Sequence, residues 1–175
     1  MKKGQLLSQP FIYIFALILG ALILVWGVKT VMDLRETSEL VELGTFVKDM
    51  ESEVNKYFFY DEGAARNFDL RLPDKIKYMC IINPETFDRN KKCIIKSKTG
   101  ELSERDCNTI EDSLTLKLVA NSNNKNNIQF LPTTAARISK FKIEHLIPEK
   151  NDQALCIINA GKMKIVSKVS HVEAS

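Results

Sequence analysis

Apolar residues dominate the start of the chain without interruption by charge. No Asp, Glu, Lys or Arg lies between Gly4 and Val28, and residues 11–28 are apolar throughout. Eighteen residues in an α-helix rise about 27 Å, which nearly matches the roughly 30 Å thickness of a bilayer's hydrocarbon core. The pattern therefore predicts one transmembrane helix over residues 10–29, after a short cytoplasmic leader of residues 1–9.

The predicted membrane segment has recognisable ends and a clear centre. Phe11 and Val28 bound it, Leu19 lies in its middle, and Trp26 lies where an interfacial aromatic is expected. A buried core helix rarely needs so long an apolar run, and an in-plane interfacial helix needs a polar face that this segment lacks. A cleaved secretory signal would have a shorter apolar region with small residues before the cut. A spanning anchor is the interpretation that remains.

The hydrophobic period changes after the apolar segment. Residues 30–60 contain no proline, and their apolar side chains recur every three or four residues among charged ones. The stripe on one helical face consists of Leu40, Leu43, Val47, Met50, Val54 and Tyr57. This spacing predicts an amphipathic continuation of the same helix, about fifty residues in all, that packs on the chain's own head. A coiled coil with a partner is the alternative. Gly63 is expected to cap the end of the helix.

Residues 61–175 follow a shorter period and carry turn residues at regular intervals. Alternating or β-branched runs stopped by Pro, Gly or Asn predict seven short strands, at residues 67–72, 75–82, 92–96, 127–131, 140–146, 154–158 and 162–169. A short helix is expected over residues 110–120, and a loop over the asparagine-rich residues 121–127. The predicted fold class is α+β: a long N-terminal helix, its first half transmembrane, followed by a small antiparallel β-rich head with disulfides.

All four cysteines, Cys80, Cys93, Cys107 and Cys156, lie in the predicted head. An even number of cysteines in a small exported domain predicts two disulfides. Zinc is the alternative, but no Cys-x-x-Cys pair is present and neither histidine lies at ligand spacing from a cysteine. Disulfides are therefore favoured over a metal site.

A local repeat favours one disulfide connectivity. The sequence Cys-Ile-Ile-Asn occurs twice, starting at Cys80 and at Cys156, each time at the end of a predicted strand. Two such strands side by side would bring these cysteines together, and Cys93 and Cys107 would then close the segment between them. A bridge from Cys80 to Cys93 across a hairpin is the other connectivity that the spacing permits.

Charge and cysteine positions indicate the same orientation. Lys2 and Lys3 precede the apolar segment, whereas Lys29 and Arg35 after it are interleaved with acidic residues. The positive-inside rule therefore leans toward a cytoplasmic N-terminus. Disulfides form outside the reducing cytosol, which places the head, residues 61–175, on the extracytoplasmic side of the cell membrane.

Composition and motifs favour a non-enzymatic protein. The 175 residues carry a net charge of +3 with acids and bases mixed throughout, which gives no reason to expect nucleic acid as a partner. His145 and His171 are the only histidines, and each is expected at the surface or rim rather than in a catalytic site. No phosphate-binding loop, His-Glu-x-x-His or Gly-x-Ser-x-Gly motif is present, so no cofactor, metal or catalytic residue is predicted.

The first residues resemble a known processing signal. Lys2-Lys3-Gly4-Gln5 is similar to the archaeal class III signal peptide, and the whole layout resembles type IV pilins and their archaeal relatives. The resemblance implies cleavage between Gly4 and Gln5, and a filament subunit or minor pilin. It also implies self-association, or contact with pilin-like partners, through the N-terminal helix. The layout is also similar to that of single-pass archaeal membrane proteins with a strand-rich tail.

Two residues support a second hypothesis. The fifth position after the cut, where pilins usually carry a glutamate, holds Gln9, and Pro10 follows it. The alternative is an uncleaved single-pass membrane protein whose ectodomain binds a protein partner. In both hypotheses the lipid bilayer is a partner of the apolar segment.

Overall fold

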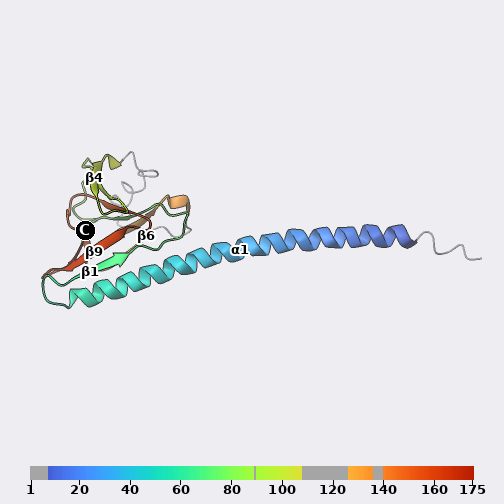
Figure 1. The fold of residues 1–175 in the computed structure, drawn as a ribbon, viewed down its shortest axis with the longest axis horizontal. Helices are drawn as coiled ribbons and strands as arrows, with labels where there is room; N and C mark the ends of the chain where they lie inside the picture. Colours follow the sequence, from blue (N-terminus) through green and yellow to red (C-terminus); the bar gives the residue numbers. More distant parts are fainter. Residues whose placement is uncertain (1–7, 89, 108–125, 136–139) are drawn as a thin grey trace, which may run out of the picture. The chain divides into compact units, whose positions relative to one another are not determined.

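The structure is a computed structural model that describes residues 8–88, 90–107, 126–135 and 140–175. One long helix, α1 (Ser8–Phe58), is followed by a β-rich domain, as Figure 1 shows. Pro10 lies in the first turn of α1, where a backbone N–H has no partner within the helix, so this proline does not interrupt it. The predicted α+β class is confirmed. The helix expected over residues 110–120, and most of the loop expected after it, lie outside the described residues.

The described part of the domain contains ten strands: β1 (Ala65–Asp69), β2 (Tyr78–Ile81), β3 (Cys93–Lys96), β4 (Leu102–Arg105), β5 (Ile128–Leu131), β6 (Lys140–Phe141), β7 (Leu146–Pro148), β8 (Leu155–Ile158), β9 (Lys162–Ser167) and β10 (Val172–Ala174). A short 3-10 helix, η2 (Thr133–Ala135), follows β5. The strands form two sheets, in the orders β1-β9-β10-β7 and β4-β3-β8-β2-β5-β6. Neighbouring strands pair antiparallel, except that β3 with β8 and β7 with β10 are parallel.

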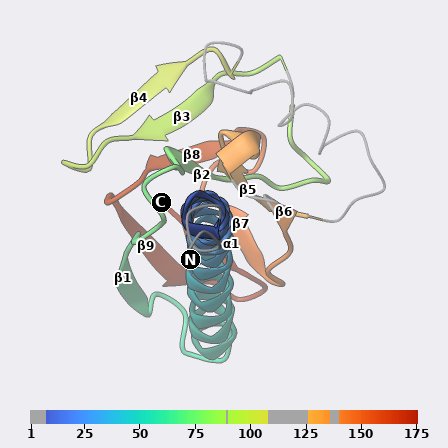
Figure 2. The ribbon, with the colours of Figure 1, turned by 90° about the vertical axis from the view of Figure 1, so that its right-hand side faces the viewer.

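The second half of α1 belongs to the core of the β-rich domain. The chain divides into two compact units, Met1–Glu39 and Leu40–Ser175, and the second unit includes the last part of the helix. Figure 2, which looks along α1, shows the strands curving around it from β1 on one side to β6 on the other. The buried side chains on the packed face are Leu43, Phe46, Val47, Met50 and Val54. The prediction that the stripe packs on the chain's own head is confirmed.

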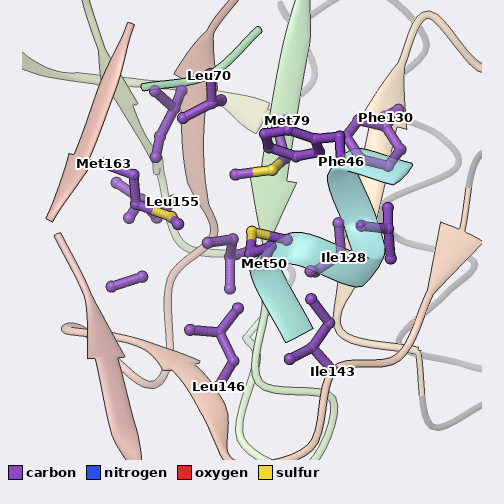
Figure 3. Packing of buried hydrophobic residues seen from close by; sticks show 14 of the residues in the cluster. Phe46, Met50, Leu70, Met79, Ile128, Phe130, Ile143, Leu146, Leu155 and Met163 are labelled. Atoms are coloured by element: carbon purple, nitrogen blue, oxygen red, sulfur yellow. The ribbon is translucent and has the colours of Figure 1, made fainter. Parts of the chain in front are cut away.

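Aromatic and methionine side chains fill the space between this helix and the sheets. Figure 3 shows Phe46 and Met50 of α1 among side chains from both sheets. The rings of Phe46 and Phe130 meet edge to face with their centroids 6.5 Å apart. Met79 of β2 and Met163 of β9 have no exposed surface. Each fully buried side chain of this size contributes about 1.5–3 kcal/mol, which explains why the stripe on α1 is apolar.

The helix ends earlier than the glycine signal suggested. α1 ends at Phe58, and the N–H of Phe59 bonds to the carbonyl of Lys56 in a tight final turn. Gly63 has a φ of +88° but lies in the turn before β1, where its N–H donates to the carbonyl of Ser167 at 3.0 Å. The prediction that Gly63 caps the helix is therefore wrong. The glycine serves the connection to the sheet, because its left-handed backbone turns the chain toward β9.

The strand predicted over residues 140–146 is interrupted. β6 ends at Phe141, and β7 begins only at Leu146, after a turn in which His145 has a φ of +65°. A left-handed residue cannot continue a strand. The prediction of one uninterrupted strand is therefore wrong here, and His145 is a turn residue rather than a strand residue.

Two strands had no signal in the hydrophobic pattern. All four residues of β4 are exposed. Three of the four, Ser103, Glu104 and Arg105, are polar, so apolar and polar residues do not alternate along the strand. β10 has only three residues, too few to define a period of two, although it lies between β9 and β7 and buries Val172 and Ala174. Tertiary pairing, rather than local pattern, creates both strands.

A buried asparagine fixes the interrupted segment. Asn127, in the asparagine-rich stretch expected to be a loop, is only 6% exposed. Its Nδ2 donates to the carbonyls of Ile143 and Leu146, both at 2.7 Å, and its Oδ1 accepts from the N–H of Ile143 at 2.8 Å. These bonds take the place of a strand partner for residues 143–146, because buried backbone groups need partners.

Candidate membrane segment and disulfide-bonded strands

The first half of α1 carries the apolar segment that the sequence singled out. Within the described residues, α1 is the one helix long and apolar enough to cross a membrane, with a mean hydropathy of 2.7 over its best 18 residues and none of that window buried. Phe11, Leu19, Trp26 and Val28 all project from α1 and are exposed. A bare apolar surface of this length is costly in water and favourable in lipid. Gly4 and Gln5 lie outside the described residues.

One face of α1, from the end of the apolar segment onward, carries no charge. Gly27, Thr30, Val31, Leu34, Thr37 and Ser38 recur every three or four residues. The charged neighbours in this stretch, such as Asp33 and Arg35, fall on other faces of a helix with 3.6 residues per turn. Val31 and Leu34 are exposed. Sequence reasoning missed this face, although its spacing can be found in the sequence.

The hydroxyl groups of the threonines on the uncharged face donate hydrogen bonds to carbonyls of the same helix. The Oγ1 of Thr30 donates to the carbonyl of Trp26, and the Oγ1 of Thr37 donates to that of Asp33, each at 2.9 Å. Because these hydroxyls are hydrogen bonded within the helix, the face presents the threonine methyl groups. A neighbouring molecule then does not need to supply hydrogen-bond acceptors for these hydroxyls. Such a face can lie against lipid or another helix without burying an unpartnered hydroxyl.

The first disulfide joins two neighbouring strands at the centre of the larger sheet. Cys80 of β2 and Cys156 of β8 are direct register partners, and their sulfurs are bonded across 76 residues of sequence. This is the pairing that the repeated Cys-Ile-Ile-Asn favoured over a bridge from Cys80 to Cys93. Both cysteines have no exposed surface. The bridge ties an early strand to a late one.

The second disulfide closes the open end of a hairpin. Cys93 begins β3, and Cys107 lies two residues beyond the end of β4, 14 residues later. The intervening turn has Gly100 at a φ of +91°, and the N–H of Ser97 donates to the carbonyl of Glu101 at 2.9 Å. The bond therefore holds β4 against β3. Two disulfides are typical of a domain outside the reducing cytosol.

The histidines lie at the surface of the domain. The exposed ring of His145 stacks on Phe58 with a centroid distance of 3.8 Å. His171 is half-buried beside Ser170 and Glu173. Among the described residues, no group of three or more His, Cys, Asp or Glu side chains could hold a metal ion. The structure thus brings together the predicted cysteine pairs, and it places the His171 ring between the Oγ of Ser170, at 3.1 Å, and a carboxylate oxygen of Glu173, at 3.4 Å.

An exposed ion pair lies near the β3–β4 hairpin. Lys91 hydrogen bonds Asp152, and this bond lowers the pKa of Asp152 and raises the pKa of Lys91. Both groups are solvated, so the pair orients two loops and adds little stability.

Comparison with protein-family models, curated proteins and solved structures finds no match to this chain.

Arginine in the middle of the apolar segment is expected to impair membrane integration. Leu19→Arg should cost about 2.5–3.5 kcal/mol of insertion free energy. The segment is close to the minimum spanning length, so a smaller fraction of the protein should resist carbonate extraction. Leu19→Val, which keeps an apolar side chain, should integrate like the parent. Equal integration of the arginine variant would mean that the membrane span is placed elsewhere.

Proposed function

We propose that this chain is a non-enzymatic, membrane-anchored surface protein of type IV pilin-like build, a filament subunit or minor pilin. The apolar first half of α1 lies in the cell membrane, with the N-terminus in the cytoplasm. The disulfide-bonded head lies on the extracytoplasmic side. The observation that carries the proposal is the single helix of 51 residues, which is apolar and exposed at its start and forms part of the head's core at its end.

This construction suits an anchored subunit for a physical reason. One helix supplies both the apolar segment of the anchor and part of the core of the head. Deleting the second half of α1 would also remove Met50 and Val54 from the head's core. An anchor joined to the head by a separate linker would need neither a helix that continues into the head nor helix side chains in the head's core.

Self-association through α1 is part of the proposal. The uncharged face formed by Gly27, Thr30, Val31, Leu34, Thr37 and Ser38 supports it. Small and hydroxyl-bearing residues let two helix backbones approach closely. Copies anchored in one membrane share an orientation, so their α1 helices would meet in parallel, with this face toward its counterpart.

The alternative remains an uncleaved single-pass protein whose head binds a protein partner. Gln9 in place of the usual pilin glutamate, followed by Pro10, favours it. The two functions differ in the fate of the leader, because a retained basic leader would prevent the N-terminal helices from packing in a filament.

The intact mass of the N-terminal peptide from native membranes tests the proposal. A pilin-like subunit should begin at Gln5, with residues 1–4 absent, and Gly4→Leu should abolish that shortening. Protease added to intact cells should remove the head, because it lies outside. A mature chain that retains Lys2 and Lys3 would contradict the pilin-like function and support the alternative. A head that is digested only after lysis would contradict the orientation in both.

A further inference from the structure

A cavity of about 310 Å³ lies between the two sheets, beside the β3–β4 hairpin. Figure 2 shows this hairpin at the outer end of the larger sheet. Ile94 of β3 and Leu155 of β8, which are register partners, line the cavity from that sheet. Pro148 of β7 and Ala174 of β10, also register partners, line it from the smaller sheet. All four side chains are buried, so the floor of the cavity is apolar.

Leu102 of β4 forms a wall of the cavity and also faces solvent. In the β3–β4 ladder, Leu102 pairs with Lys96, and Glu104 pairs with Ile94. Residues opposite each other across a ladder share one face of the sheet, so these side chains all lie on the cavity side of the hairpin. Leu102 is 60% exposed at this lining. An apolar occupant would remove part of that surface from water, which is favourable.

The charged groups around the cavity compensate one another. Lys150, after β7, forms an ion pair with Glu104 of β4 at 3.1 Å. The Nζ of Lys96 donates to the carbonyl of Ser175 at 2.9 Å. Burial lowers the pKa of this ammonium group, and attraction by the carboxylate of Glu149 opposes the shift. Each carboxylate that lines the cavity thus has an ammonium group near it, so these residues offer an ionic ligand no unopposed charge.

A second hollow in the described part of the chain provides a contrast. Its volume is about 390 Å³, and its lining includes Asp74, Lys77, Lys98 and Asn159. An apolar ligand there would displace water from charged and amide groups without replacing their hydrogen bonds, which is unfavourable. The apolar floor therefore distinguishes the cavity between the sheets from this polar hollow.

We propose that the cavity between the sheets is a binding site for a neutral, apolar small molecule of about the size of a single aromatic ring. Ligand-binding pockets have volumes of about 300–1,000 Å³, so a cavity at the lower end suits a small ligand. A charged or polar ligand group on the floor would lose its hydration without gaining a partner, because Ile94, Leu155 and Ala174 have only apolar side chains. The inference goes beyond the proposed function, since it depends neither on leader cleavage nor on filament formation.

Three related probes, added to the full chain in lipid nanodiscs, test the proposal. Toluene, benzoate and benzylammonium share one ring but are neutral, negative and positive, and the aqueous concentration of each is measured from its own NMR signals. Toluene should shift the methyl signals of Ile94 and Leu155 saturably, with a Kd of about 1 mM or lower. Benzoate and benzylammonium should bind at least about tenfold more weakly, because their charges would lose hydration without an unopposed partner. The methyl signals of Ile76 and Ile158, which line the polar hollow, should not shift.

Two alanine variants give a matched pair. Ala174→Leu extends a buried side chain into the cavity, so the affinity for toluene should fall about tenfold or more. Ala65→Leu makes the same substitution at an exposed position on β1, and the Kd should change by less than about threefold. Intermolecular NOEs between toluene and the Ile94 methyl groups should be present in the parent and in Ala65→Leu but absent in Ala174→Leu.

Several outcomes would overturn the binding site. They are the absence of saturable shifts at Ile94 and Leu155 up to the aqueous solubility of toluene, equal affinities for the three probes, shifts confined to Ile76 and Ile158, and unchanged binding to a folded Ala174→Leu variant. The probe series decides the matter even where Ala174→Leu fails to fold, because it leaves the protein unchanged.

Discussion

Loss of Cys156 is expected to lower the free energy of unfolding by about 4 kcal/mol, because its bridge to Cys80 closes the longer of the two loops. Its cysteines are separated by 76 residues, against 14 for Cys93 and Cys107, so Cys107→Ala should cost less, about 3 kcal/mol. Either loss is a large share of the roughly 5–15 kcal/mol that small domains possess. Alanine is the suitable replacement, because a serine hydroxyl would be buried without a partner.

Denaturant unfolding of the full chain in detergent, without reductant, measures these effects. The second half of α1 must be present, because it supplies part of the core. Cys80→Ala should match Cys156→Ala, and the double variant should add little further loss. A match between Cys80→Ala and Cys93→Ala would contradict the connectivity. Unchanged stability in all variants would mean that the cysteines are not bridged in the protein as expressed.

Truncation of Met50 is expected to destabilise the head by about 3 kcal/mol, within the range of roughly 2–5 kcal/mol for a buried methionine replaced by alanine. Met50 has no exposed surface and lies on α1 among side chains of both sheets. Its removal leaves a cavity where the helix meets the strands, because close-packed surroundings relax only partly around a truncated side chain.

Asn55→Ala is the matched control for Met50→Ala. Asn55 is exposed on the same helix, and its replacement should change stability by less than about 0.5 kcal/mol. The two variants should retain equal membrane integration, since neither alters the apolar segment. An equally small effect of Met50→Ala would mean that α1 is not part of the head's core, and the compact unit would then begin after the helix.

The apolar segment and the helix stripe could be predicted because each is a local property of the sequence. Eighteen consecutive apolar residues exceed what a soluble core requires, and no distant contact is needed to recognise them. The stripe through Leu43, Val47, Met50 and Val54 has the period of one helical face and therefore identified the buried side. Phe46 completes that face in the structure but interrupts the strict alternation of three and four, so the stripe left it out.

The cysteine pairing could be predicted only in part from the sequence. The repeat at Cys80 and Cys156 indicated two similar strands, but only the register of β2 with β8 places the sulfurs opposite each other. The spacing alone also permitted a bridge from Cys80 to Cys93. Those two cysteines lie on different strands with β8 between them, which excludes their pairing in this fold.

The sequence by itself determined the apolar segment, the amphipathic helix and the presence of a cross-linked β-rich head, because hydrophobic period and cysteine number are local properties of the sequence. Only the tertiary structure decided where strands begin and end at the margins of the sheets. β4 exists because β3 pairs with it, β10 because β9 and β7 flank it, and the break at His145 because Asn127 binds the backbone there. These strand boundaries depend on pairing partners far away in sequence, so they cannot be predicted from a short window of residues.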